Sequence, residues 1–177
     1  MRFMAIAGAV AALTATMALA QDFEALVDER QQGMKDMGSA MKAMGPIMKG
    51  ETAYDAAAVH EAAQTIASHS GETLVNWFPE GSIDVADSDA KPEIRDRHEE
   101  FAALARQLHD YALALDAAAD AGLGAPGEGG EADLGALLGT APAEDAFDIE
   151  TASADAIYGE VGKTCGTCHK TFRVDDD

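Results

Sequence analysis

The first pattern along the chain is a seam of apolar side chains between Asp22 and Lys49 that recur at steps of seven, three, four, three and four residues. This spacing is typical of an amphipathic helix with a narrow buried face. Gly45-Pro46 should kink or end the helix near its last turn, and Lys49-Gly50 should close it. Methionine dominates the seam, which consists of Val27, Met34, Met37, Met41, Met44 and Met48.

Three further stretches with the same period predict helices over about residues 54–78, 92–121 and 152–172. Pro79–Ser82 should end the second helix, residues 82–90 form a polar loop, and Pro92 suits the first turn of the third helix. Because no stretch alternates like a strand, the sequence predicts an all-α, antiparallel four-helix bundle. The expected inward-facing residues are Val59, Ala62, Ala63, Ile66, Thr73, Leu74, Trp77, Ile94, Phe101, Leu104, Leu108, Tyr111, Leu115, Ile157, Val161, Cys165, Cys168 and Phe172.

Residues 122–149 break this pattern, because they are rich in glycine and acidic side chains and include Pro126 and Pro142. A connection of this length is unusual inside a compact domain. It is either a functional lid or a solvated linker, and the composition favours the linker.

The N-terminus has the features of a secretory signal peptide. Arg2 precedes an uncharged apolar run that ends in Ala18-Leu19-Ala20, a small-x-small cleavage pattern. We expect cleavage after Ala20, export to the periplasm, a mature domain over residues 21–177, and no stable membrane insertion after cleavage. The alternative is an uncleaved membrane anchor, for which the run is just long enough.

The charge of the chain limits its partners. The formal net charge is −20, and removing Arg2 with the signal peptide makes it more negative. Nucleic acids and anionic membrane surfaces are therefore poor partners. An acidic surface can steer a basic partner or simply keep the protein in solution, and both interpretations stay open.

The chemistry of the chain is concentrated in Cys165-Gly166-Thr167-Cys168-His169 near the C-terminus. C-x-x-C-H is the attachment motif of c-type haem, in which the two thiols form thioethers and the imidazole binds iron. On a helix the three side chains share one face, so all can reach one haem lying between helices near the C-terminal helix. A thioredoxin-like C-x-x-C would need a βαβ setting, and structural zinc would need two further ligands.

Three more residues are candidates for the same site. Arg30 falls on the apolar seam, where a charge needs a partner such as a haem propionate, unless its stem carries the guanidinium to solvent. Arg173 stands one turn beyond His169 and can cover the haem, bind a propionate, or complement the helix dipole. Because few residues follow His169, a sixth iron ligand must come from upstream, and the helix around Met34 is the best source.

These features together resemble the class II c-type cytochromes, which include cytochrome c′ and its low-spin relatives. The resemblance covers nearly all of the mature chain. It implies thioether links at Cys165 and Cys168, His169 as the proximal ligand, and Arg30 and Arg173 beside the haem. The matching pieces are Arg30-Gln31 with Met34, Phe78–Ser82, Lys91–Ile94 with Phe101, and Cys165–His169 with Arg173.

The resemblance places Met34 at the distal position, where the family divides. Low-spin members use a methionine there as sixth ligand and carry electrons, whereas cytochrome c′ keeps the iron five-coordinate and open to nitric oxide or carbon monoxide. Arg95 replaces a tryptophan found in many members, and the 122–149 connection is longer than the family pattern. The extra length and the net charge could oppose the homodimer that the resemblance implies.

The leading prediction is a periplasmic monohaem cytochrome that carries electrons between redox partner proteins. The alternative is a cytochrome c′-like protein that binds small gas ligands. A third hypothesis is a haem-free bundle that uses its cysteines in a disulfide or a zinc site. An enzyme is not predicted, because no acid–base or nucleophile constellation accompanies the haem motif.

Overall fold

The computed structural model describes residues 10–124 and 147–174, with side chains from Phe23 onward. Most of the 122–149 connection, and the start of the predicted signal peptide, lie outside the described residues. The described chain contains no strand. Its helices are α1 (Val10–Met48), α2 (Ala56–Ser68), α3 (Gly71–Asn76), α4 (Glu93–Asp96), α5 (His98–Ala118), the 3₁₀ helix η1 (Ala119–Ala121) and α7 (Ala154–Phe172).

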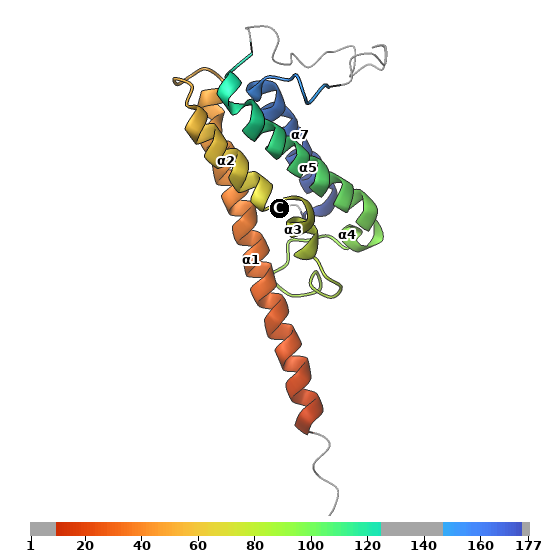
Figure 1. Cartoon of the computed structure of the whole chain (residues 1–177). Coiled ribbons are helices and arrows are strands. Elements are labelled where there is room, and N and C mark those ends of the chain that lie inside the picture. Colours follow the sequence, from red (N-terminus) through yellow and green to blue (C-terminus); the bar gives the residue numbers. More distant parts are fainter. Residues whose placement is uncertain (1–9, 125–146, 175–177) are drawn as a thin grey trace, which may run out of the picture.

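The four long helices α1, α2, α5 and α7 form an antiparallel bundle, which confirms the predicted fold class (Figure 1). α1 packs against α2, α2 against α5, α5 against α7, and α7 contacts α1 again. The N-terminal part of α1 extends beyond the other helices (Figure 1). Within the described residues, no helix is both long and apolar enough to span a membrane.

The first helix is longer than predicted at its N-terminal end and passes through Pro46. Pro46 lies in the last turn of α1, where the loss of one backbone N–H hydrogen bond interrupts only the end of the helix. Gly50 has φ +67° and its N–H bonds to the Ile47 carbonyl, while the Glu51 N–H bonds to the Pro46 carbonyl. This is the Schellman closure that a glycine after the helix end permits.

The single helix predicted for residues 54–78 is wrong, because the chain breaks between α2 and α3 at His69-Ser70. Gly71, the first residue of α3, has φ +60°, so the backbone leaves the right-handed helical conformation at this point. A Cβ at Gly71 would lie 3.2 Å from the His109 ring, so the break brings the start of α3 close to α5.

The third predicted helix is also broken, at Arg97, where φ −123° and ψ 40° separate α4 from α5. Backbone hydrogen bonds continue across the break, from Arg97 N to Glu93 O and from Phe101 N to Arg97 O. Two hydrogen bonds to and from Arg97 therefore span the bend. The fourth helix ends at Phe172, as expected.

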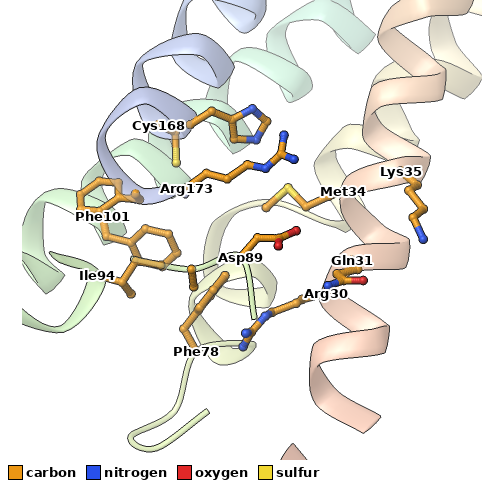
Figure 2. Close-up of a pocket in the computed structure, with 13 residues that line it drawn as sticks. Arg30, Gln31, Met34, Lys35, Phe78, Asp89, Ile94, Phe101, Cys168 and Arg173 are labelled. Carbon is orange, nitrogen blue, oxygen red and sulfur yellow. The ribbon is translucent and has the colours of Figure 1, made fainter. Parts of the chain in front are cut away.

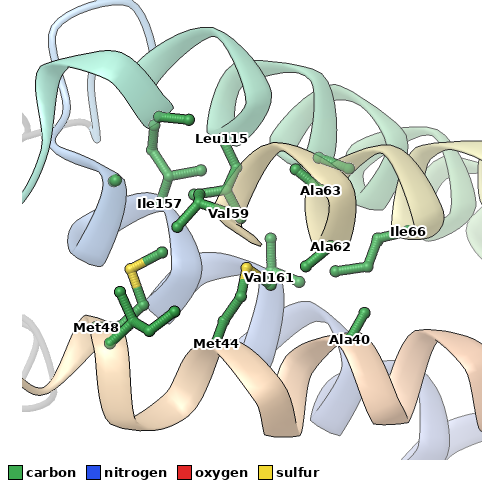
Figure 3. Packing of buried hydrophobic residues seen from close by; sticks show 14 of the residues in the cluster. Ala40, Met44, Met48, Val59, Ala62, Ala63, Ile66, Leu115, Ile157 and Val161 are labelled. Carbon is green, nitrogen blue, oxygen red and sulfur yellow. The ribbon is translucent and has the colours of Figure 1, made fainter. Parts of the chain in front are cut away.

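Two buried clusters of apolar side chains fill the bundle. In the first, α1, α2, α5 and α7 contribute residues that include Met44, Val59, Leu115 and Val161 (Figure 3). The second is smaller and joins α3, α4, α5 and the end of α7 through Leu74, Trp77, Ile94, Phe101, Ala105 and Phe172. Most predicted inward positions are buried or half-buried, but Thr73 is exposed because the short α3 presents Leu74 and Trp77 to the core instead.

Candidate haem site

A cavity of about 300 Å³ lies beside the second cluster, between α1, the end of α7 and the segment from Phe78 to Phe101 (Figure 2). Its apolar walls consist of Met34, Phe78, Ala90, Ile94, Phe101 and Phe172. Phe101 makes edge-to-face contacts with Phe78 and Phe172, with ring centroids 5.0 and 5.4 Å apart. Such packing gives the cavity a rigid aromatic floor.

The C-x-x-C-H motif lies on α7, where Cys168 and His169 line the cavity (Figure 2). Cys165 stands one turn earlier, is half-buried, and packs against the first cluster rather than lining the cavity. The two thiols are not joined in a disulfide. The structure thus brings Cys168 and His169 directly to the cavity, with Cys165 on the same helix behind them.

The local environment changes the pKa values of all three motif side chains. Burial raises the pKa of Cys165, and burial together with the charge of Cys165 raises the pKa of Cys168 to about 11. Both thiols are therefore protonated at neutral pH. Partial burial, followed by the nearby charge of Arg173, lowers the pKa of His169. The imidazole is neutral at pH 7 and keeps the lone pair that a metal ligand needs.

Arg30 is buried under the cavity, with 4% of its surface exposed. The alternative in which its stem carries the charge to solvent is therefore wrong. Its guanidinium lies 4.7 Å from the centroid of the Phe78 ring and donates to neutral oxygens only. These are the Trp77 carbonyl at 3.3 Å, the Ser82 carbonyl at 3.2 Å, the Ser82 hydroxyl at 3.4 Å and the Ser88 hydroxyl at 2.6 Å.

Met34 and Arg173 enter the cavity from two different helices. Met34 is half-buried on α1, packs against both clusters, and points toward the cavity (Figure 2). Arg173 follows the last residue of α7 in an extended conformation and lines the opposite side. Met34 on α1 and His169 on α7 therefore line the same cavity from two different helices.

A short antiparallel pairing of residues 89–91 with residues 172–174, called the strap below, holds Arg173 in place. Ala90 and Arg173 form a β-bridge. The Lys91 N–H donates to the Phe172 carbonyl at 2.9 Å, and the Val174 N–H donates to the Asp89 carbonyl at 2.8 Å. Sequence reasoning missed the strap, since two backbone segments of ordinary composition carry no pairing signal.

Sequence reasoning also missed Asp89, which lines the cavity from the strap. Its charge raises the pKa of Arg30, although burial has the larger effect and leaves that pKa lowered. The predicted loop over residues 82–90 was correct, but nothing in its polar composition distinguished Asp89 or Ser88 from their neighbours.

The residues of the cavity fit a haem. A porphyrin needs apolar walls and its two carboxylates need cations, and the cavity supplies aromatic side chains together with Arg30, Lys35 and Arg173. Among the described residues that line the cavity only Asp89 is acidic, although the whole chain has 12 basic and 32 acidic side chains. The described residues contain no group of three His, Cys, Asp or Glu side chains placed to hold a metal, so the zinc alternative has no support.

A helical bundle with C-x-x-C-H on its last helix and a cavity of this kind defines a c-type cytochrome. The sequence model described as Cytochrome C' matches residues 25–142, more than half the chain and a part that ends before Cys165. The chain therefore belongs to the cytochrome c′ family, the class II c-type cytochromes, and carries covalently bound haem c, as the sequence predicted. The motif and the family match are independent observations because they cover different residues.

Curated relatives and a solved structure agree with this assignment. The chain is 33% identical to cytochrome c' of Rhodospirillum rubrum, over 98% of this chain and 99% of the relative. It is 32% identical to cytochrome c-556 of Agrobacterium fabrum, over 84% of this chain and 80% of the relative. A nitric oxide complex of a mutant of cytochrome c prime from Alcaligenes xylosoxidans superposes with TM-score 0.61 and 26% identity, over 86% of this chain and 97% of that chain.

Proposed function

We propose that this c-type cytochrome is an electron carrier of the periplasm, in which Cys165 and Cys168 hold the haem and His169 and Met34 ligate its iron. The observation that carries the proposal is the position of Met34, which points into the cavity from α1 while His169 lines it from α7 (Figure 2). The bound haem supplies a one-electron couple, and methionine ligation raises its potential. Apolar walls exclude water from the ligand side, and Arg30 and Arg173 supply charge for the propionates.

Replacing Met34 with alanine tests this ligation. We expect Met34→Ala to turn the oxidised haem from low spin to high spin, because the sixth ligand is lost. The absorption spectra of the oxidised and reduced holoprotein report the change directly. Met41→Ala is a matched control, since Met41 lies on the same helix, is half-buried in the first cluster and does not line the cavity. An identical low-spin spectrum in Met34→Ala would exclude Met34 as the ligand.

The second candidate function is binding of a gas ligand at an open iron site, with Met34 as a steric gate. The solved nitric oxide complex of the mutant relative from Alcaligenes xylosoxidans favours it. Addition of carbon monoxide to the reduced wild-type protein separates the two functions. Rapid binding with a high-spin starting spectrum supports the gas ligand, whereas a split low-spin spectrum that barely responds supports the electron carrier.

We also propose that the chain is exported and cut after Ala20, leaving one bundle domain over residues 21–177 with 122–149 as a linker. Cytochromes of this kind acquire their haem outside the cytoplasm, which agrees with the apolar leader. Redox proteins are the expected partners, and no substrate chemistry is assigned to the chain. Mass spectrometry of the protein from a periplasmic extract tests this: the mature chain should begin at Gln21 and carry one haem.

A further inference from the structure

Asp89 is the one acidic side chain among the described residues that line the cavity. Figure 2 shows its carboxylate between Met34 and Arg30, on the side of the cavity that faces α1. The residue itself is exposed, so the carboxylate lies at the rim. It therefore adds negative charge at the place where the other lining charges, Arg30, Lys35 and Arg173, are positive.

The backbone on both sides of Asp89 is fixed, which keeps its carboxylate at the rim. The Asp89 carbonyl accepts the Val174 N–H at 2.8 Å as part of the strap. On the other side, the Ser88 hydroxyl accepts from the Arg30 guanidinium at 2.6 Å and from the Ala90 N–H at 3.3 Å. None of these hydrogen bonds involves the side chain of Asp89, so replacing that side chain removes none of them.

Asp89 also supplies a negative charge, which the hydrogen-bond partners of the buried Arg30 lack. Within the described residues, every oxygen that accepts a hydrogen bond from Arg30 is uncharged. The charge of Asp89 favours the protonated guanidinium, against the effect of burial. A cation held only by neutral acceptors is costly to bury, and the charge of Asp89 offsets part of this cost.

We propose that Asp89 sets the reduction potential of the haem, holding it lower than the cations of the cavity alone would. This inference deepens the proposed electron-carrier function and rests on the family's haem. An electron added to the haem is repelled by a nearby carboxylate, so the oxidised form is favoured. The described cavity also holds the cations Arg30, Lys35 and Arg173, so removing the carboxylate of Asp89 makes the potential in the cavity more positive, and a bound haem would hold the electron more strongly.

The test is a spectroelectrochemical titration of the haem-loaded mature protein and its Asp89→Asn variant. We expect Asp89→Asn to raise the potential, with a gain of roughly three- to tenfold in the equilibrium constant for electron uptake. The gain should shrink at high salt, because an exposed charge is screened. Asp89→Glu keeps the charge and should stay near the wild-type potential.

Asp87→Asn is the matched control, since it removes the same charge from the same exposed loop but from a side chain that does not line the cavity. Equal shifts in Asp87→Asn and Asp89→Asn, or no shift in Asp89→Asn, would overturn the inference. A parallel Asp89→Ser variant tests whether loss of the carboxylate disturbs folding or haem binding. If Asp89→Asn and Asp89→Ser both lose haem while Asp89→Glu keeps it, Asp89 has a structural role and the inference is overturned.

The same experiment separates this inference from the proposed function, because the spectra of the same samples report the spin state. A low-spin haem whose potential does not respond to Asp89→Asn overturns the role of Asp89 alone. A high-spin, five-coordinate haem whose potential rises in Asp89→Asn supports Asp89 and overturns the methionine-ligated carrier.

Discussion

Gly33 lies on α1 against the ring of Trp77, one residue before Met34. A Cβ at this position would lie 2.8 Å from Cζ3 of Trp77 and closer still to Cη2. Trp77 is buried, and its carbonyl accepts a hydrogen bond from Arg30. The absent side chain of Gly33 therefore allows the close approach of α1 to the segment that carries both Trp77 and the wall of the cavity.

We predict that Gly33→Ala destabilises the protein although alanine is the better helix former. The gain in helix propensity is about 1 kcal/mol, whereas displacing a buried tryptophan ring in a well-packed core costs about 1–3 kcal/mol. The cost of overpacking should therefore exceed the gain in helix propensity, and the unfolding midpoint measured by circular dichroism should fall.

Gly38→Ala is the control for this prediction. Gly38 lies on the same helix, is exposed, and a Cβ there would meet no atom within 4 Å. This substitution should stabilise the protein by up to about 1 kcal/mol, because only the propensity changes. A Gly33→Ala variant as stable as Gly38→Ala would show that the Trp77 ring moves aside at no cost.

Polar contacts between elements join the helices outside the apolar clusters. The Ser70 hydroxyl and the His109 ring both lie within hydrogen-bond distance of the Ala67 carbonyl near the end of α2, so α5 helps close the break before α3. On the same pair of helices, His60 of α2 lies 2.8 Å from Asp116 of α5 and 3.4 Å from Asp120 of η1. His60 and His109 thus both connect α2 with α5.

The His60 contacts predict a pH-dependent contribution to stability. Hydrogen bonds to Asp116, and then to Asp120, raise the pKa of His60 in the folded protein. Because the pKa of His60 is higher in the folded protein, protonation of His60 stabilises the fold fully at pH values below the unfolded-state pKa of about 6.5. This stabilisation is lost as the pH rises through the pKa of His60 in the folded protein. His60→Gln should therefore reduce stability more at pH ~5.5 than at pH ~9.

Denaturant unfolding of both proteins at the two pH values measures this difference. His98→Gln is the comparison variant, because His98 is exposed on α5 and the structure gives it no carboxylate contact. If His60→Gln were equally destabilising at both pH values, the contacts with Asp116 and Asp120 would not depend on the charge of the imidazole.

At the scale of the whole molecule, the helical period of the apolar residues predicted the bundle, because each long helix buries an apolar face to which many residues contribute. The seam from Val27 to Met48, and the face of α7 that carries Cys168 and Phe172, follow from that period. The breaks at Gly71 and Arg97 did not follow, since a single residue with unusual backbone angles hardly changes a periodic pattern.

The candidate site, like the fold, was predictable from the sequence only in part. The positions of Met34, Arg30, Cys168, His169 and Arg173 around one cavity were expected from the motif, the helical period and the family resemblance. Asp89 and the strap were not, because their positions depend on backbone pairing between segments distant in sequence. Local patterns report which face of a helix is buried, but not which loop covers the end of the bundle.

The net charge of −20 predicts that salt stabilises this protein. Repulsion among like charges destabilises the compact state, and it is screened as the Debye length falls from about 30 Å at 0.01 M salt to about 3 Å at 1 M. Salt also weakens ion pairs, but the Lys and Arg pairs of the described residues, which include Arg97 with Glu100, are exposed or partly exposed and worth at most about 1 kcal/mol each. The repulsion should dominate, so the unfolding midpoint should rise with sodium chloride. A similar rise in potassium chloride would exclude a specific sodium site, whereas a falling midpoint would mean that local ion pairs outweigh the net charge.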